Sequence, residues 1–527
     1  MKLRYYLSTA VAALFLIGGT AWAQVTVVKS GNWSDPTTWS TGAVPTATDD
    51  VVIEDSTVYV DVADAKARNV TIRGSGQLLY QRDPSLQGFE LSVHGNLVIE
   101  GPDAELRPLS QEDQTTGQGL GIVYHRLVVY GDIDNSTGGT FDMRRGATSS
   151  NPPTAAFVDL YFVGDTDSHV TLGEYDTNKN QLFQVFIQKE NGARVVLHSD
   201  VTQDNNSLAK LHLDSGYIVT NEFRWRVYSN SSSAVVGGSP ESYVIGALSR
   251  GIPTNSSGSA YERVFPVGDE NGYRPVTIYS SAKISDDQDF EVRVIPGDAD
   301  PGGATFQGGL TDVSPVRYYA FTMYDRDSSD PYTVEKIAIT YGSDDGVPEG
   351  SSDFVVATSV DENRMVWRNS GGFDPATGQP HVTSLANPPT PIQSDMLTDF
   401  MFELTLVPGN PPQIARDTYY AAIGTKSAFT VAAEEITAVD GFRLGPAYPN
   451  PFQEATRIVL ELPRVAPVDV RVYDLLGREV ARLAEGTWTP GTHTLMWKPA
   501  AGVAPGLYLI RVQAGALTAT RKVMVVR

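Results

Sequence analysis

Few residue arrangements in this sequence could carry out catalysis. There is no cysteine that could act as a nucleophile, and no G-x-S-x-G turn that would present a serine. The seven histidines lack the H-x-H or H-E-x-x-H spacing that binds zinc. Glycines at 117, 119 and 121 precede a strand pattern rather than a helix, so we expect a loop there and no phosphate site.

Acidic residues are the remaining candidates for a site. Asp325, Asp327 and Asp330 are spaced closely enough to bind Ca²⁺. An EF-hand loop, however, needs glycine at its sixth position and glutamate at its twelfth, where this chain has Asp330 and Lys336. We therefore expect a solvated loop, with a calcium site as the alternative, and no other cofactor.

A second acidic set follows repeated glycines, at Asn96, Asp132 and Asp165. If the segments that carry them stack in register, the three side chains lie about 4.8 Å apart. Two carboxylates so close must splay, share a proton or hold a cation. Turn residues that point into water are one interpretation, and a Ca²⁺ bridge through Asp132 and Asp165 is the other.

These candidates belong to a repeated strand pattern. The segments that begin at Leu91, Leu127 and Leu160 alternate apolar and variable positions and then turn at Gly followed by Asn or Asp. Their offsets of roughly 33 to 36 residues are typical of stacked repeats, in which each coil covers its neighbour. The sequence therefore predicts an all-β fold with a right-handed parallel β-helix-like region at 24–236; an antiparallel sandwich is the alternative.

The rest of the chain also predicts short strands between turns. An Asn271-Gly272 turn predicts a hairpin, and about seven short strands with Trp367 in their core predict an Ig-like β-sandwich. The expected divisions are a small β linker module at 237–312, the Ig-like sandwich at 313–428, a linker at 429–440, and a separate C-terminal unit at 441–527.

Charge supports this division and excludes one class of partner. The chain of 527 residues has a formal net charge of −22, which argues against nucleic acid. Residues 441–527 contain 11 Arg and Lys against 6 Asp and Glu, so this unit alone is positive. Export without disulfides is expected, because a domain of this size can be stabilised by apolar burial.

The N-terminus predicts a secretory signal peptide at 1–23. Lys2 and Arg4 precede an apolar stretch that is too short to span a bilayer, and an A-x-A motif ends at Ala23. We expect cleavage between Ala23 and Gln24; an uncleaved anchor is the alternative. No later apolar run approaches the ~18 residues of a membrane helix, so the mature chain is expected to have no transmembrane segment.

The C-terminal unit contains four distinctive segments. Two prolines that flank Asn450 fix an extended turn, and alternating apolar residues around Tyr473 predict a strand that ends at a glycine corner. Together the segments resemble the type A C-terminal sorting domain of the type IX secretion system. The matching residues are Tyr448, Pro449, Asn450, Pro451, Tyr473, Gly477, Gly506, Tyr508 and Lys522.

This resemblance implies a small Ig-like fold and a route to the cell surface. Its expected partners are the type IX secretion machinery and a surface lipopolysaccharide. The implied route runs through the periplasm and the outer membrane, followed by removal of the domain and attachment of the remainder.

The beginning of the solenoid region resembles the opening of G8-like β-helical modules of bacterial surface proteins. Gly31, Trp33 and Trp39 are followed by Gly42, Pro45 and an Asp-Val-Val-Ile strand. Two tryptophans on a turn-rich segment are suited to cover the open end of a solenoid. Sugar stacking on an exposed tryptophan is the alternative.

Two functions fit these observations. The first is an exported, non-catalytic display protein, adhesive or structural, that binds extracellular polysaccharide or other surface proteins. The second is a secreted β-helix lyase or glycosidase that degrades polysaccharide, although no spacing selects a pair of carboxylates.

Overall fold

The computed structural model divides into two compact units, residues 1–429 and 430–527, each with a hydrophobic core of its own. The described residues form strands and two 3₁₀ turns, Pro36–Thr38 and Ser343–Asp345, and no α-helix. The structure describes residues 24–526 except for 111–112, 114–120, 150–152, 176–178, 253–254, 256, 283–287, 326–331, 346–352, 362, 380–389, 398–400, 403–413, 427–442, 449–451, 453–454, 463, 475–477, 501–502, 505 and 516.

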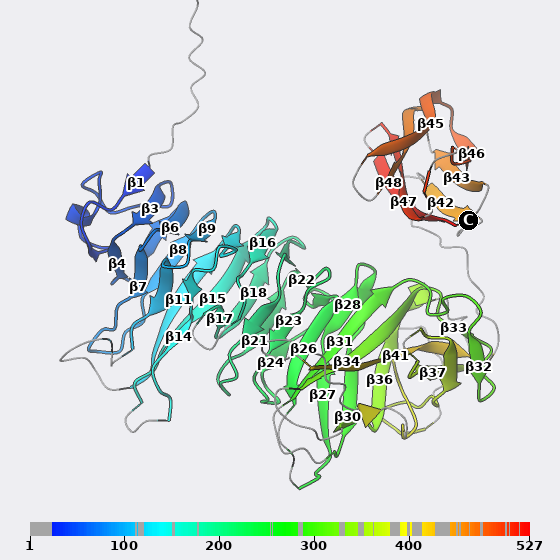
Figure 1. Ribbon diagram of the computed structural model, residues 1–527, viewed down its shortest axis with the longest axis horizontal. Coiled ribbons are helices and arrows are strands. Elements are labelled where there is room, and N and C mark those ends of the chain that lie inside the picture. Colours follow the sequence, from blue (N-terminus) through cyan, green and yellow to red (C-terminus); the bar gives the residue numbers. More distant parts are fainter. Residues whose placement is uncertain are drawn as a thin grey trace, which may run out of the picture. The chain divides into compact units, whose positions relative to one another are not determined.

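The first unit begins as a solenoid with three faces, of which sheet 1 is the longest (Figure 1). Its neighbouring strands are parallel except for the last pair. In spatial order, sheet 1 contains β1 (Gln24–Thr26), β3 (Asp50–Glu54), β6 (Asn69–Arg73), β9 (Leu97–Glu100), β12 (Ile133–Asp134), β16 (Ser168–Thr171), β19 (Arg194–Leu197), β22 (Tyr217–Val219), β25 (Val244–Ile245), β28 (Val267–Asp269) and β29 (Gly272–Tyr273).

Sheets 2 and 3 form the other faces of the early coils. Sheet 2 contains β13 (Thr140–Phe141), β10 (Glu105–Pro108), β7 (Gln77–Tyr80), β4 (Thr57–Val60) and β2 (Gly31–Asn32). Sheet 3 contains β24 (Val235–Gly237), β21 (Leu211–Ser215), β18 (Val185–Lys189), β15 (Ala156–Gly164), β11 (Val123–Val129), β8 (Glu90–Val93) and β5 (Ala65–Ala67), and β14 (Arg144–Arg145) pairs with β15.

The repeat that the sequence predicts is present as strand register. Leu127 lies opposite Leu91 on one side and Leu160 on the other, in three parallel strands. All three leucines are buried, because alternate side chains of each strand point into the solenoid. The prediction of an all-β, β-helix-like region is thereby confirmed, whereas the predicted right-handedness stays a prediction.

The solenoid continues directly into an antiparallel part through sheet 4. β26 pairs in parallel with β23 and antiparallel with β31, so one sheet changes direction without a break. Sheet 4 contains β17 (Gln181–Leu182), β20 (Val201–Gln203), β23 (Trp225–Val227), β26 (Ala247–Ile252), β31 (Gln288–Pro296), β34 (Arg317–Asp325), β41 (Ile414–Thr425), β37 (Phe354–Ser359), β38 (Val366–Asn369) and β32 (Thr305–Gln307), with β33 (Asp312–Val313) beside β41.

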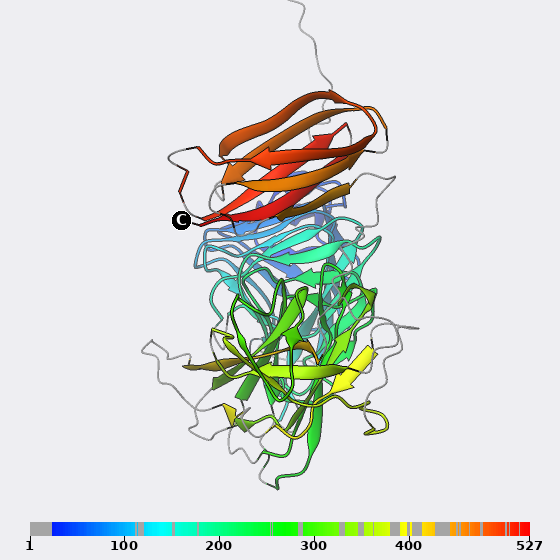
Figure 2. The same ribbon diagram turned by 90° about the vertical axis from the view of Figure 1, so that its right-hand side faces the viewer.

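The antiparallel part also contains sheet 5 and a short two-stranded sheet (Figure 2). Buried residues from Val25 to Ile423 form one hydrophobic core, so packing continues across residues 237 and 313. A hairpin is present at the predicted place, but its turn residues are Glu270 and Asn271 and not Asn271 and Gly272, because Gly272 pairs with Asp269. Sheet 5 contains β27 (Tyr261–Phe265), β30 (Val276–Ser280), β36 (Lys336–Tyr341) and β39 (Thr390–Gln393); β35 (Tyr332–Thr333) pairs with β40 (Met401–Phe402).

A buried ion cluster lies where the solenoid meets the antiparallel part. Arg317 is 1% exposed, and its Nε lies 2.7 Å from Asp269 Oδ2 of β28. The same guanidinium pairs with Asp344 and Asp345 in the second 3₁₀ turn. Arg274 adds a second cation, with its Nε 3.4 Å from Asp345 Oδ2. The cluster therefore ties the last solenoid coil to the segments that follow it.

The second unit consists of two antiparallel sheets around its own core of buried residues, among them Val470, Trp497 and Val523. One sheet contains β42 (Arg443–Tyr448), β43 (Thr456–Leu462) and β46 (Gly491–Trp497). The other contains β45 (Glu479–Trp488), β44 (Ala466–Asp474), β47 (Gly506–Ala514) and β48 (Leu517–Val525). An Ig-like topology stays a prediction for both this unit and the antiparallel part of the first.

Candidate functional site

The acidic loop predicted as a calcium candidate lies mostly outside the described residues. Asp325 ends β34, and Asp327 and Asp330 follow in the gap at 326–331. Among the residues that the structure describes, no three His, Asp or Glu side chains gather as metal ligands.

A ladder of hydrogen bonds runs across neighbouring strands of sheet 1 at their N-terminal ends. It includes the side chains of Asn96 and Asp132, which follow the repeated glycines. Asn69 Oδ1 accepts from the backbone N–H of Asn96 at 2.7 Å, and Asn96 Oδ1 accepts from that of Asp132 at 3.0 Å. Asp132 Oδ1 then accepts from His169 N–H at 2.8 Å. His169 and not Asp165 is therefore next in register, because β15 continues to Gly164, beyond Phe162, which pairs with the last residue of β11.

A buried lysine lies beside the acidic end of this ladder. Lys189 Nζ donates to the carbonyl oxygens of Val163 at 2.7 Å and Thr166 at 2.8 Å. Burial lowers the pKa of Lys189 to about 8, while the carboxylates of Asp132 and Asp165 act in the opposite direction. An ammonium group thus already supplies positive charge next to the two carboxylates.

Glycine precedes Asn96 and Asp132 because the previous coil approaches these two positions closely. A Cβ at Gly131 would overlap Asn96 Oδ1 and would lie 2.7 Å from the Gly95 carbonyl oxygen. Gly164 has φ +86°, whereas Gly95 and Gly131 do not have positive φ. At these two positions glycine therefore supplies the space that the missing side chain leaves for the ladder, and not a left-handed backbone.

We expect Gly131→Ala to lower the free energy of unfolding by roughly 1–3 kcal/mol, because the added methyl group displaces Asn96. Denaturant unfolding of the mature chain measures this loss. Asn96→Ala removes one of the obstructing atoms, so the double variant should lose less than the sum of the two single losses. Strict additivity would contradict a close-contact origin.

The two tryptophans near the N-terminus are buried. Trp33 is 0% exposed and Trp39 2%, and their rings meet edge to face with centroids 5.0 Å apart. Trp39 Nε1 donates to the Trp33 carbonyl oxygen at 2.9 Å. These side chains cover the first coils from within, as expected of a lid, and neither offers a ring face for sugar stacking.

The outward face of sheet 3 carries the most chemically distinctive surface, which we call the sheet 3 flank. It consists of Glu90, Arg126, Asp159, Gln184, Tyr161, Phe186 and His212. Parallel register places Glu90, Arg126 and Asp159 side by side on three neighbouring strands. Arg126 Nη1 lies 2.9 Å from Glu90 Oε2, so the guanidinium occupies the space between the two carboxyl groups.

Aromatic rings stack along the same flank. The ring centroids of Tyr161 and Phe186 are 4.3 Å apart, and those of Phe186 and His212 are 4.0 Å apart. The Arg126 guanidinium lies over the Tyr161 ring, 4.4 Å from its centroid. The ring faces are thus covered by one another, so the flank presents ring edges and polar groups to solvent.

Asp159 is the titratable group of this flank with the largest perturbation. Burial raises its pKa to about 7, against the opposing effects of a Gln184 hydrogen bond and the Arg126 charge. Gln184 Nε2 lies 3.3 Å from Asp159 Oδ1, and Gln184 Oε1 lies 3.3 Å from His212 Nε2. Burial also lowers the pKa of His212. The flank therefore joins a carboxyl, an amide and an imidazole across three strands.

The raised pKa of Asp159 predicts a pH-dependent stability. The folded chain holds the proton of the Asp159 carboxyl more tightly than the unfolded chain does. The contribution of this proton to the free energy of unfolding is therefore complete below about pH 4 and is lost as the pH rises through about 7. We expect Asp159→Asn to stabilise the protein at pH 8 by roughly 2–4 kcal/mol and to have little effect at pH 4. Thermal melts at both pH values measure this difference.

Asp214→Asn is the control for this experiment, because Asp214 is exposed and lies two residues after His212 in β21. A stabilisation of the Asp159 variant that is equal at pH 4 and pH 8 would contradict the assignment.

Other buried carboxyl groups are accompanied by arginine. Asp289 and Glu291 of β31 meet Arg226 of β23 and Arg224, the residue before that strand. Asp142 is a second carboxyl whose pKa burial raises to about 7. These three buried carboxyl groups are thus held in ion pairs with arginine. Such an arrangement suits structural support more than proton transfer to a substrate.

Sequence reasoning alone missed the sheet 3 flank, because its members come from different coils and only strand register joins them. The available signal was an outward aromatic residue at the same step of consecutive repeats, as at Tyr161, Phe186 and His212.

The predicted sorting residues that the structure describes are distributed over several strands of the second unit. Gly506 begins β47, and Tyr508 is buried with its hydroxyl donating to the Ala504 carbonyl oxygen at 2.7 Å. Tyr473 is half-buried in β44, Tyr448 ends β42, and Lys522 lies in β48. Outside the described residues are Pro449, Asn450, Pro451, Gly477 and Ala23; Gln24 begins β1.

Two family models match parts of the chain. Residues 446–526 match the secretion system C-terminal sorting domain, and residues 38–125 match the G8 domain. No curated protein and no solved structure matches the chain.

The C-terminal match marks a protein that is exported and attached at the cell surface through type IX secretion, and it implies interaction with that machinery. Both resemblances noted in the sequence are confirmed. In the part of the chain that the structure describes, no helix is long and apolar enough to cross a membrane.

Proposed function

We propose that the first unit is a non-catalytic display module, which holds an adhesive surface away from the cell. The supporting observation is the hydrophobic core that runs from Val25 to Ile423, together with sheet 4, which crosses from the solenoid to the antiparallel part without a break. Such a continuous core restrains the coils relative to one another, so a surface on them is held at a fixed place. Removal of the sorting domain and attachment to a lipopolysaccharide complete this proposal.

The sheet 3 flank is the proposed adhesive surface. It exposes polar groups and aromatic edges over several coils, which suits an extended partner such as an extracellular polysaccharide or another surface protein. The guanidinium of Arg126 between Glu90 and Asp159 argues against cleavage, because a scissile bond would have to occupy that space.

A polysaccharide-degrading enzyme is the second candidate, and Asp159 is the observation that favours it. A carboxyl with a pKa of about 7 is suited to act as a general acid. Glu90 lies two strands away, or about 9.6 Å at the usual strand spacing, near the upper limit for inverting glycosidases.

One screen separates the two functions. The mature chain is applied to a glycan array and incubated with the same polymers, with calcium and with chelator. We expect binding without chain shortening, and loss of binding in Arg126→Ala but not in Arg73→Ala, an exposed arginine on another sheet. Product release that disappears in Asp159→Asn and Glu90→Gln would establish the enzyme instead.

The proposed calcium bridge at Asp132 and Asp165 is tested by melts of the same samples. Superimposable curves with and without chelator would rule it out.

A further inference from the structure

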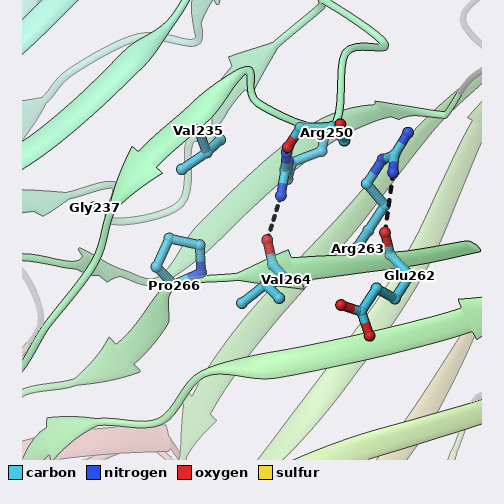
Figure 3. A pocket seen from close by; sticks show the side chains of 8 residues that line it. Val235, Gly237, Arg250, Glu262, Arg263, Val264 and Pro266 are labelled. Atoms are coloured by element: carbon cyan, nitrogen blue, oxygen red, sulfur yellow. Dashed lines mark hydrogen bonds between the residues drawn. The ribbon is translucent and has the colours of Figure 1, made fainter.

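A pocket of about 260 Å³ lies where sheet 3 ends (Figure 3). The third strand of the next coil, β27, leaves the solenoid and joins sheet 5, so β24 has no following partner in sheet 3. Val235 and Gly237 of β24 form one wall, and Val264 and Pro266 form another. The change of sheet therefore opens a space inside the coil that apolar side chains fill elsewhere.

Two arginines enter this space from β26 and β27, which follow one another in the chain but belong to different sheets. Arg250 of β26 is 4% exposed and Arg263 of β27 is 6% exposed. Arg250 lies in register with Val227 and Phe290, which are core residues, so its strand directs it inward. Burial and the charge of Arg263 lower the pKa of Arg250 to about 9, and burial also lowers that of Arg263. Two like charges thus share a site away from water.

Only neutral oxygens accept hydrogen bonds from this pair. Arg250 donates to the carbonyl oxygens of Val264 and, at 3.1 Å, Ser232. Arg263 donates to those of Glu262 at 2.9 Å and Asn230 at 3.1 Å. Since a guanidinium has five N–H groups, more than half of the pair's donors have no protein acceptor among the described residues. Arg263 Nε is buried and unpaired.

No carboxylate balances the two charges within the described part of the chain. Arg317 and Arg224, also buried, each pair with acidic side chains. Glu262 lines the pocket, but its side chain is exposed and points to the opposite face of β27 from Arg263 (Figure 3). A pair of desolvated cations without a counter-charge is costly unless an anion joins them.

We propose that this pocket binds a carboxylate group on a ligand about the size of one sugar residue, held between Arg250 and Arg263. The planar guanidinium fork matches the two oxygens of a carboxylate. The volume of about 260 Å³ accommodates one such unit but no longer chain. A net charge of −22 repels polyanions at long range, which favours a ligand with a single charge.

This site is distinct from the sheet 3 flank and does not depend on the proposed adhesion. A uronic acid residue at the end of a glycan and a free organic acid share the required chemistry. The test therefore compares glucuronate with acetate and includes glucose as the neutral sugar.

The experiment measures melting temperature and heat of binding for the mature chain at constant ionic strength. We expect millimolar glucuronate to raise the melting temperature in a saturable manner while glucose does not. Arg263→Met should weaken binding at least tenfold, whereas Arg73→Met should leave it unchanged. Acetate as effective as glucuronate would support the carboxylate and assign a free acid as its source.

A second variant guards against loss of folding. Val235 is half-buried, lines the pocket and lies opposite the buried Leu211, so Val235→Trp fills the space without removing either arginine. It should keep the melting temperature of the ligand-free protein and lose the ligand-induced shift. Absence of a shift with both carboxylates, an equal shift in Arg263→Met, or a shift with sulfate alone would overturn the proposal.

Discussion

A chain that ends at Asp440, without residues 441–527, will not reach the cell surface and will accumulate in the periplasm. The second unit has its own core and the opposite charge to the rest, so its deletion leaves the first unit folded but removes the segment that the machinery recognises. Labelling of intact cells in a host with type IX secretion measures the loss, which we expect to be complete.

Two variants of the last strand test whether the export machinery requires the second unit to be folded. Val523 is 0% exposed and Met524 is 37% exposed, on opposite faces of β48. Val523→Asp should abolish surface labelling because it unfolds the unit, whereas Met524→Asp should retain it. Surface labelling of the truncated chain at the level of the full chain would show that residues 441–527 are dispensable.

Replacing Arg317 with Met will destabilise the first unit by roughly 3–5 kcal/mol. The substitution leaves Asp269 and Asp345, which are 2% and 0% exposed, without their main counter-charge. Burial already raises the pKa of Asp345, and loss of the guanidinium removes the largest opposing effect. Lowering the pH, which protonates the carboxylate of Asp345, should therefore recover part of the loss, and melts across the pH range measure this recovery.

Two controls test this prediction: an ion pair that is exposed to solvent, and removal of the carboxylate charges that Arg317 balances. Arg73→Met breaks an ion pair whose side chains are 43% and 54% exposed, so we expect a loss below about 1 kcal/mol. Asp269→Asn and Asp345→Asn in the Arg317→Met chain remove the carboxylate charges that Arg317 balanced and should restore part of the stability. A loss for Arg317→Met no larger than that for Arg73→Met would mean that the cluster does not hold the junction.

Local patterns were sufficient for the solenoid. Leu91, Leu127 and Leu160 could be aligned for two reasons. Period-two alternation shows which side chains of a strand must be buried, and the similar spacing of the segments shows which neighbouring segment buries them. The same alignment failed at Asp165, since β15 runs on past the position where β11 ends and thereby changes the register that the glycine suggests.

Long-range pairing explains what local patterns missed. Nothing around residues 247–252 shows that this strand will pair in parallel on one side and antiparallel on the other, which is what joins the solenoid to the antiparallel part. The Glu90–Arg126–Asp159 row and the Arg250–Arg263 pair arise in the same way. Each depends on strands that are brought together by pairing rather than by neighbouring sequence.

The order of strands in sheet 1 gives the first unit a polarity. β1 and the buried tryptophans lie at one end of that sheet, and the chain leaves the unit after β41, which lies beyond its other end. When the protein is attached from its C-terminal side, the Trp33–Trp39 end is therefore the leading tip. Each further coil would lengthen the reach of that tip by about 4.8 Å without widening the module, so reach could change by whole coils while the contacting surface stays the same.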